Sequence, residues 1–226
     1  MSLPYYVPPE QLMKDRAEYA RKGIARGRSI VALEYTDGIV LMGENTSGAL
    51  HKISEIYDRV AFAGVGKYNE FESLRVAGIR HADIKGYSYA RADVSARSLA
   101  NAYSQTLGHI FTHEVKPYEV EVFVVEVGDT PAGNDLFRVT YDGTLYDEEG
   151  FAAIGGQAEE LTTQLGDGYQ AGRDLAAAVA LAATVVQRVE DRAIPGDDWE
   201  AAVVDRTLGR RTFRRLATAE IEAAIS

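Results

Sequence analysis

The sequence predicts an α+β fold, in which runs of strands and pairs of helices follow one another along the chain. Alternating apolar runs meet at Thr36-Asp37-Gly38 and again at Asp142-Gly143, and both turns are typical of β-hairpins. Strands joined by such tight turns form antiparallel sheets, and paired helices need a sheet face to cover. With 226 residues, 46% of them hydrophobic, the chain is long enough to bury a substantial core. We therefore expect one domain over residues 9–226, preceded by a short segment 1–8.

The N-terminal part divides into an apolar segment and a helix. Residues 1–8 read MSLPYYVP, which is aromatic and lacks the polar bias of a disordered tail. From Pro9 the pattern becomes helical, with Gly23 or Gly27 as the expected end of the helix. The apolar residues that share one face of this helix are Leu12, Met13, Ala17, Ala20 and Ile24.

Four strands and two helices are predicted next. The strands are expected at 30–35, 39–42, 52–57 and 59–65. Asn69 and Glu72 resemble a capping box at the start of the first helix, and Asp93 is the expected N-cap of the second. The residues expected to face inward from these two helices are Phe71, Leu74, Gly78, Ala82, Leu99, Tyr103, Leu107 and Phe111.

The second half of the chain repeats this alternation of strands and helices. Strands are expected at 119–127, in a hairpin over 136–146, at 151–156, at 200–205 and at 212–217. Two helices separate the last two of these strands from the others, one from Ala158 and one with Asp174 as N-cap, and a helical turn ends the chain. The predicted order is helix, four strands, two helices, three strands, two helices, two strands, helix.

Composition excludes several classes of function. A net charge of −10 and a pI of about 4.9 disfavour a nucleic-acid partner, which would need a basic face. The chain has no cysteine, so disulfides, thiolate metal sites and a cysteine nucleophile are excluded. Neither a signal-peptide stretch nor an apolar run of about 18 residues occurs, so no membrane association is expected. A soluble cytoplasmic protein without a cofactor is the simplest prediction.

Two local motifs look like ligand sites but fail on inspection. The segment AGVGK at 63–67 resembles a phosphate loop, yet Ala61 stands in place of the first glycine and Tyr68 in place of the hydroxyl residue. His109 and His113 have the spacing of zinc ligands on a helix, but no glutamate lies between them and no third ligand is evident. We expect a strand-to-helix turn at the first motif and no metal at the second.

A basic run near the C-terminus offers a further alternative. Its members are Arg206, Arg210, Arg211, Arg214 and Arg215. These arginines could form a phosphate patch, but in an acidic chain such a run is more typical of an exposed strand face or a subunit contact.

Several long strings, in order, resemble the proteasome α-subunit family. They are EQLMKDRAEYARKGIARGRSIVALEY, HKISEIYDRVAFAGVGKYNEFESLR, GYSYAR, LANAYSQTLGHIFT and KPYEVEVFVVEV. The resemblance covers essentially the whole chain. The chain is similar to the actinobacterial branch of the family in particular. It implies a four-layer αββα sandwich, of the N-terminal nucleophile hydrolase type, with two antiparallel sheets between helix pairs and an extra N-terminal helix.

The resemblance also explains why the opening hairpin carries no nucleophile. Active β-subunits of the family begin with a threonine whose free amine serves as base, supported by an acidic residue and a lysine. Aligned on the Asp37-Gly38 turn, these places are held here by Arg28, Glu44 and Lys52. The hydroxyl is absent, and a helix precedes the place where a free amine would be needed. No catalytic residue is therefore expected, while Glu44 could still be an ordinary surface charge.

By resemblance, the chain forms the outer homoheptameric rings of a proteasome core with β-subunits. A pocket of Lys52, Gly27 and Gly66 would receive the C-terminal carboxylate of a ring-shaped ATPase or other activator, which delivers tagged protein substrates. The segment 1–8 would close the axial pore. Its expected gate residues are Leu3, Tyr5, Tyr6 and Val7. The Tyr-Asp-Arg gating triplet of archaeal and eukaryotic relatives is absent from residues 1–12, so other contacts must close this gate.

Two alternatives remain open on the sequence. The chain could itself be a threonine peptidase of the same fold, although no Gly-Thr junction before Ile30 could be processed to expose a threonine. It could also be a purely structural ring-former without activator docking, against which the combination of Lys52 with Gly27 and Gly66 argues.

Overall fold

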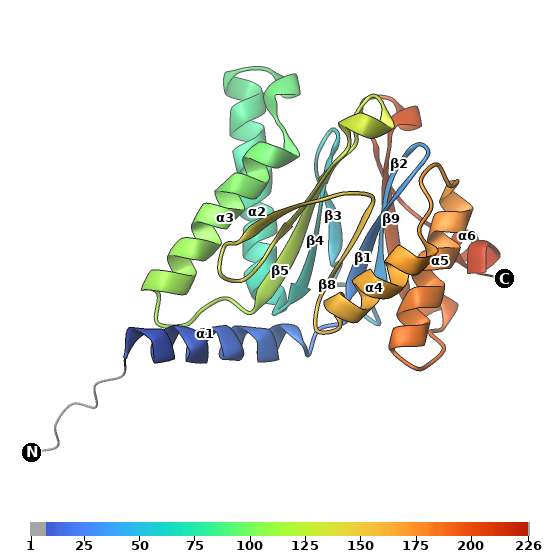
Figure 1. Cartoon of the computed structure of the whole chain (residues 1–226). Coiled ribbons are helices and arrows are strands. Elements are labelled where there is room, and N and C mark those ends of the chain that lie inside the picture. The colour runs from blue at the N-terminus through green and yellow to red at the C-terminus, as the bar shows by residue number, and fades with distance from the viewer. Residues whose placement is uncertain (1–7, 226) are drawn as a thin grey trace, which may run out of the picture.

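Two antiparallel sheets of five strands each form the centre of the computed structural model, which describes residues 8–225 (Figure 1). The strand orders are β10-β9-β2-β1-β8 and β3-β4-β5-β6-β7. The strand bounds of the first sheet are β1 Ile30–Tyr35, β2 Gly38–Glu44, β8 Phe151–Ile154, β9 Trp199–Asp205 and β10 Phe213–Arg215. Those of the second sheet are β3 Ile53–Tyr57, β4 Val60–Gly66, β5 Val120–Glu126, β6 Asp135–Val139 and β7 Leu145–Glu148.

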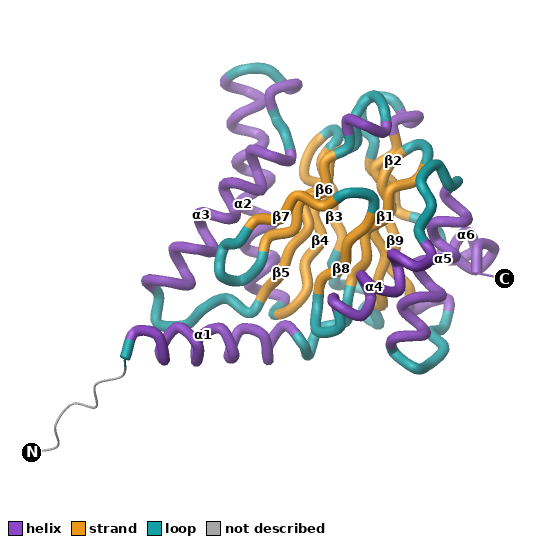
Figure 2. Tube along the Cα trace, viewed as in Figure 1, coloured by secondary structure: helices purple, strands orange, loops and turns teal. Residues whose placement is uncertain are grey.

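Helices cover the outer face of each sheet. The helix bounds are α1 Pro9–Ile24, α2 Tyr68–Ser88, α3 Ala96–His113, α4 Ala158–Gly168, α5 Leu175–Val189 and α6 Thr218–Ile225. The pair α2 and α3 lies against the sheet that contains β4 and β5, whereas α4, α5 and α6 lie on the side of β1, β2 and β9 (Figure 2). The predicted four-layer αββα sandwich is therefore confirmed.

Three buried clusters correspond to the three interfaces between the layers. The central cluster joins the two sheets through residues such as Ile30, Leu41 and Phe123, all of them at most 1% exposed. One outer cluster packs α2 and α3 on their sheet around Phe62, and the other packs α4 and α5 on theirs around Val203. Alternating apolar residues along each strand supply both faces of a sheet, because successive side chains point to opposite sides.

The N-terminal helix α1 lies across the ends of the strands rather than on a sheet face (Figure 1). Only its C-terminal part is buried, at Ala20, Gly23 and Ile24. Leu12, which the sequence pattern places on the apolar face of this helix, is 43% exposed. Within residues 8–225, the apolar face of the first turns of α1 is therefore not covered at Leu12.

Two predicted helix caps are wrong, although the helices themselves are present with the expected inward faces. Helix α2 begins after Lys67 without a side-chain cap, and Glu72 pairs with Arg75 instead of capping. Helix α3 is capped by the Ser95 hydroxyl, which accepts from the Ser98 amide, while Asp93 accepts from Ala90 in the preceding turn. A capping pattern in sequence does not fix which of several nearby polar residues reaches the free amides.

The predicted order of elements holds with one difference. Four strands, β5 to β8, separate α3 from α4 where three were expected, because the hairpin around Asp142-Gly143 contributes two strands. Asp174 caps α5 as predicted, through the Ala177 amide. The expected gate residues Leu3, Tyr5, Tyr6 and Val7 lie outside the described residues.

Candidate functional site

The three residues predicted for the docking pocket come together at the end of the sandwich that faces α1. The backbone carbonyl of Lys52, just before β3, accepts a hydrogen bond of 3.0 Å from the Gly64 amide of β4. Gly66 ends the same strand. A Cβ on Gly27 would lie only 3.0 Å from the Gly66 nitrogen, so the loop after α1 touches the end of β4 at these two glycines.

Gly66 has a backbone conformation that only glycine adopts readily. Its φ is +110°, and a Cβ there would lie 1.9 Å from the Glu119 carbonyl oxygen of the neighbouring strand. The Lys67 amide donates to that same carbonyl at 2.9 Å. The expected strand-to-helix turn is therefore present at AGVGK, and close backbone approach accounts for its last glycine.

The Lys52 amine lies half-buried beside the end of β2. Its Nζ donates a hydrogen bond of 2.8 Å to the backbone carbonyl of Glu44. Burial lowers the pKa of Lys52 below the usual lysine value, with the nearby Arg28 acting in the same direction, while Glu200 and Glu44 oppose the shift through their charges. No carboxylate forms an ion pair with this amine anywhere in residues 8–225.

The Glu44 carboxylate is committed to two arginines. Glu44 is 3% exposed, so the alternative of an ordinary surface charge is wrong. Its Oε2 lies 3.1 Å from Nε of Arg28 and also accepts from Arg192, which follows α5. Glu190 lies 3.3 Å from Arg28 and 3.8 Å from Arg192, so two acids and two arginines alternate around a closed ring of charges. Sequence reasoning missed Arg192 and Glu190, because they join Glu44 only through the tertiary fold.

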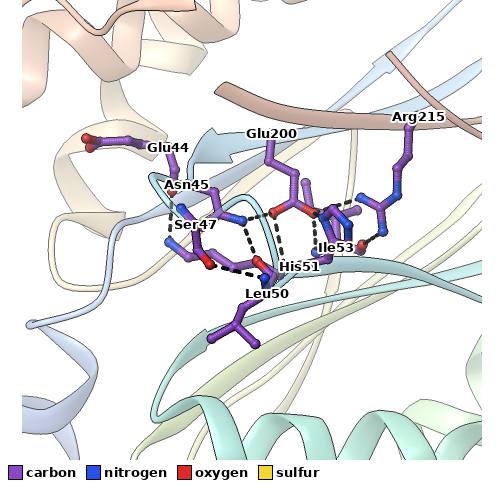
Figure 3. Close-up of polar contacts among 9 residues, drawn as sticks. Glu44, Asn45, Ser47, Leu50, His51, Ile53, Glu200 and Arg215 are labelled. Atoms are coloured by element: carbon purple, nitrogen blue, oxygen red, sulfur yellow. Dashed lines mark hydrogen bonds and ion pairs between the residues drawn. The ribbon is translucent and has the colours of Figure 1, made fainter. Parts of the chain in front are cut away.

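A second buried acid near Lys52, Glu200 of β9, is equally occupied (Figure 3). It accepts from the backbone amides of Lys52 and Ile53 at 3.0 and 3.1 Å and from the Asn45 side chain at 2.7 Å. Arg215 adds an ion pair of 2.8 Å. Glu200 thus fixes the backbone at the start of β3, and its carboxylate forms its ion pair with Arg215.

The place of a nucleophile is held by Arg28, as predicted. Its side chain is 50% exposed and points to Glu44 and Glu190. The preceding chain continues into α1, so no free amine adjoins this position. Because residue 28 has no hydroxyl and no free amine adjoins it, the position of the nucleophile offers no group for attack.

The arginine run at 206–215 is fully engaged within the chain. Arg206 donates to the carbonyls of Gly128 and Thr36 and to Asn134. Each of the others has an acidic partner. These ion pairs are Arg210–Asp58, Arg211–Glu55, Arg214–Glu220 and Arg215–Glu200. The phosphate-patch alternative therefore loses its support, and β10 takes the expected place of an edge strand.

The other motifs of the sequence do not develop into sites. His109 and His113 stack with ring centroids 4.5 Å apart, and no group of three or more possible metal ligands occurs among the described residues. None of the helices in the described part of the chain is both long enough and apolar enough to cross a bilayer.

A sandwich with these layers has the architecture of the amide-hydrolase fold, and Arg28 holds the position of the nucleophile in this chain. Residues 24–204 match the family described as proteasome subunit. A protein from Acidothermus cellulolyticus named proteasome subunit alpha is 58% identical over 98% of this chain and 97% of its own length. Its namesake from Kineococcus radiotolerans is 59% identical over 96% of this chain and 95% of its own length. The chain belongs to the proteasome subunit family, on its α-subunit branch.

Proposed function

We propose that this chain is the non-catalytic α-subunit of a proteasome core, that it assembles with itself into heptameric rings and with β-subunits, and that its Lys52 docks the C-terminal carboxylate of an activator. The docking partner expected from the family resemblance is a ring-shaped ATPase that delivers tagged proteins. The observation that carries the proposal is the Lys52 amine, which is half-buried and has no carboxylate partner in residues 8–225.

An unpaired ammonium in this setting favours an incoming carboxylate. Among the described residues, the Lys52 amine donates a hydrogen bond only to the Glu44 carbonyl. It can therefore donate further hydrogen bonds to a ligand. A lysine presents a compact charge, and its partial burial strengthens the attraction to an anion relative to one in open water. Gly27 and Gly66 allow the backbone beside Lys52 to pack closely, because a Cβ on either glycine would collide with Val65 or with the Glu119 carbonyl.

Lys52→Ala tests the docking directly. We expect intact rings but activator binding weakened about tenfold or more, because a charge-assisted hydrogen bond is worth about 1.5–3 kcal/mol. The measurement is ATPase-stimulated degradation of a tagged substrate by particles with parental or variant α-subunits and the same β-subunits. Arg211→Ala, which removes an exposed cation elsewhere, serves as the control. Equal stimulation of Lys52→Ala and parental particles would place docking elsewhere.

The isolated chain is proposed to be inactive as a peptidase. Arg28 offers no nucleophile, and α1 precedes it. Purified chain without β-subunit should not cleave fluorogenic peptides. Activity that persists after removal of all β-subunit, and that a threonine-directed covalent inhibitor blocks, would support the alternative of a threonine peptidase instead.

We also propose that residues 2–8 gate the axial pore. The sequence SLPYYVP is apolar where a solvated tail would be polar, and copies that meet on a symmetry axis could bury Leu3, Tyr5, Tyr6 and Val7 against one another. Deleting residues 2–8 should raise small-peptide turnover by the assembled particle at equal β-subunit content. If intact truncated particles, checked by electron microscopy, cleave no faster than parental ones, the segment is not a gate.

A further inference from the structure

We infer that Arg28 and Arg192 hold the Glu44 carboxylate away from Lys52, and that this restraint keeps the docking amine free for an external carboxylate. The inference rests on the proposed docking function and adds two positioning residues to it. Neither arginine needs to touch the ligand in this arrangement. Their effect passes through Glu44, whose backbone carbonyl accepts from the Lys52 amine.

Glu44 contacts Lys52 through its backbone and the arginines through its side chain. The carbonyl accepts from the Lys52 amine at 2.8 Å, while the carboxylate points away from the other labelled residues (Figure 3). It lies against Arg28 and Arg192 instead. The hydrogen bond with Glu44 raises the pKa of Arg192, as expected for a committed ion pair.

Removing both arginines would leave a buried carboxylate without its cations. A buried charge is unfavourable unless it is paired, so the Glu44 side chain would turn to the nearest remaining cation. That cation is Lys52, because its amine already contacts the backbone of the same glutamate. An internal Glu44–Lys52 ion pair would then compete with any incoming carboxylate.

The turn that follows α5 positions Arg192 beside Glu44. Asp191 has φ +51°, the one positive-φ residue other than glycine among those described, and it follows the last residues of the helix. The Arg192 amide donates back to the Gln187 carbonyl at 3.2 Å, which closes the turn. A left-handed residue at this position is a common helix ending. Here it directs the chain so that Arg192 reaches Glu44 at the end of β2.

The test measures binding of a fluorescently labelled peptide to assembled rings. The peptide carries the C-terminal residues of the partner ATPase with a free carboxylate, and its amidated form is the ligand control. The double variant Arg28→Ala with Arg192→Ala should bind on the order of tenfold more weakly than the parent, which is the scale of one lost charge-assisted contact. Adding Glu44→Gln to this double variant should restore most of the affinity, because no carboxylate remains to occupy Lys52.

The charge-preserving pair Arg28→Lys with Arg192→Lys guards against misfolding and should keep near-parental binding. A double alanine variant that binds like the parent would overturn the inference. So would a triple variant that stays weak, since that result would mean that the arginines act by their own field and not through Glu44. If Lys52→Ala and peptide amidation have no effect on binding, the proposed docking function fails instead.

Discussion

Two cationic regions of this molecule differ in whether their charges are available. The arginine run at 206–215 is the more conspicuous in the sequence, with five arginines in ten residues. All five are engaged within the chain, four of them with acids. Lys52 lies near Glu44 and Glu200, which are both paired with arginines, and its amine has no carboxylate partner in the described part of the chain.

The difference teaches that pairing, rather than the number of charges, decides whether a cation is available to a ligand. An arginine with an internal partner must break that ion pair before it can bind another anion. A half-buried lysine with free donors has already lost much of its hydration on folding, so a ligand carboxylate recovers interaction that the fold has left unsatisfied. Three predictions test this contrast between the two regions, from the largest expected effect to the smallest.

The largest effect is expected from the glycines that border the two regions. Gly66 and Gly209 both have positive φ, but a Cβ on Gly66 would collide with the Glu119 carbonyl, while nothing lies within 4 Å of a Cβ on Gly209. Gly66→Ala should destabilise the chain by about 3 kcal/mol or more, from backbone strain together with overpacking. Gly209→Ala should cost about 1–2 kcal/mol, from strain alone.

Denaturant unfolding of the two variants and the parent measures this difference. Because Gly209 shares the unfavourable φ but not the collision, the gap between the variants isolates the contact with Glu119. Equal losses of stability in the two variants would show that the contact with Glu119 makes a Cβ at Gly66 no more unfavourable than one at Gly209.

A smaller effect is expected when internal ion pairs are removed from the arginine run. Arg215→Ala deprives the buried Glu200 of a cation and should lower the free energy of unfolding by about 1–3 kcal/mol. Arg211→Ala breaks an exposed pair with Glu55 and should change it by about 0–1 kcal/mol. Thermal unfolding of the two variants and the parent at the same pH compares their stabilities. If Arg211→Ala proves the more damaging, burial of the acidic partner does not decide the value of these pairs.

The smallest effect concerns pH. A carboxylate ligand needs the protonated Lys52 amine, whose pKa is lowered by burial and by Arg28 and sustained by Glu200 and Glu44. Peptide affinity should therefore be level near neutral pH and decline as the pH rises through this lowered pKa, earlier than for an exposed lysine near 10.5. The ligand stabilises the charged form, so binding should take up protons in this range.

Binding isotherms between about pH 7 and about pH 10, in buffers of different ionisation enthalpy, would record both the decline and the proton uptake. An affinity that rises with pH over this range would contradict the role of a protonated lysine.

Most of the sandwich could be predicted from local sequence, since its strands and hairpins follow from apolar alternation and turn residues. The features that local sequence does not predict depend on a partner. Helical periodicity places Leu12 on an apolar face but does not show whether another element covers that face, and Leu12 is exposed. Ser95, not Asp93, caps α3 because several polar residues compete for the same free amides.

The residues of the candidate site could be predicted from the sequence, but the ion pairs around them could not. Lys52, Gly27 and Gly66 followed from a family resemblance, and the structure brings their backbones to one edge. The Glu44 carboxylate pairs with Arg192, which lies 148 residues from Glu44 in sequence. No local signal marks such a contact, because it depends on how the end of α5 meets the end of β2.

A double-mutant cycle between Lys52 and the terminal carboxylate of an activator peptide tests the central claim most directly. The four affinities needed are those of parental and Lys52→Ala rings for the same peptide in its free-acid and amidated forms. We expect amidation to weaken binding to parental rings about tenfold or more, and to make almost no difference to Lys52→Ala rings, which corresponds to a coupling of about 1.5–3 kcal/mol. Equal effects of amidation on both kinds of ring would contradict the account, because the carboxylate would then bind somewhere other than the Lys52 amine.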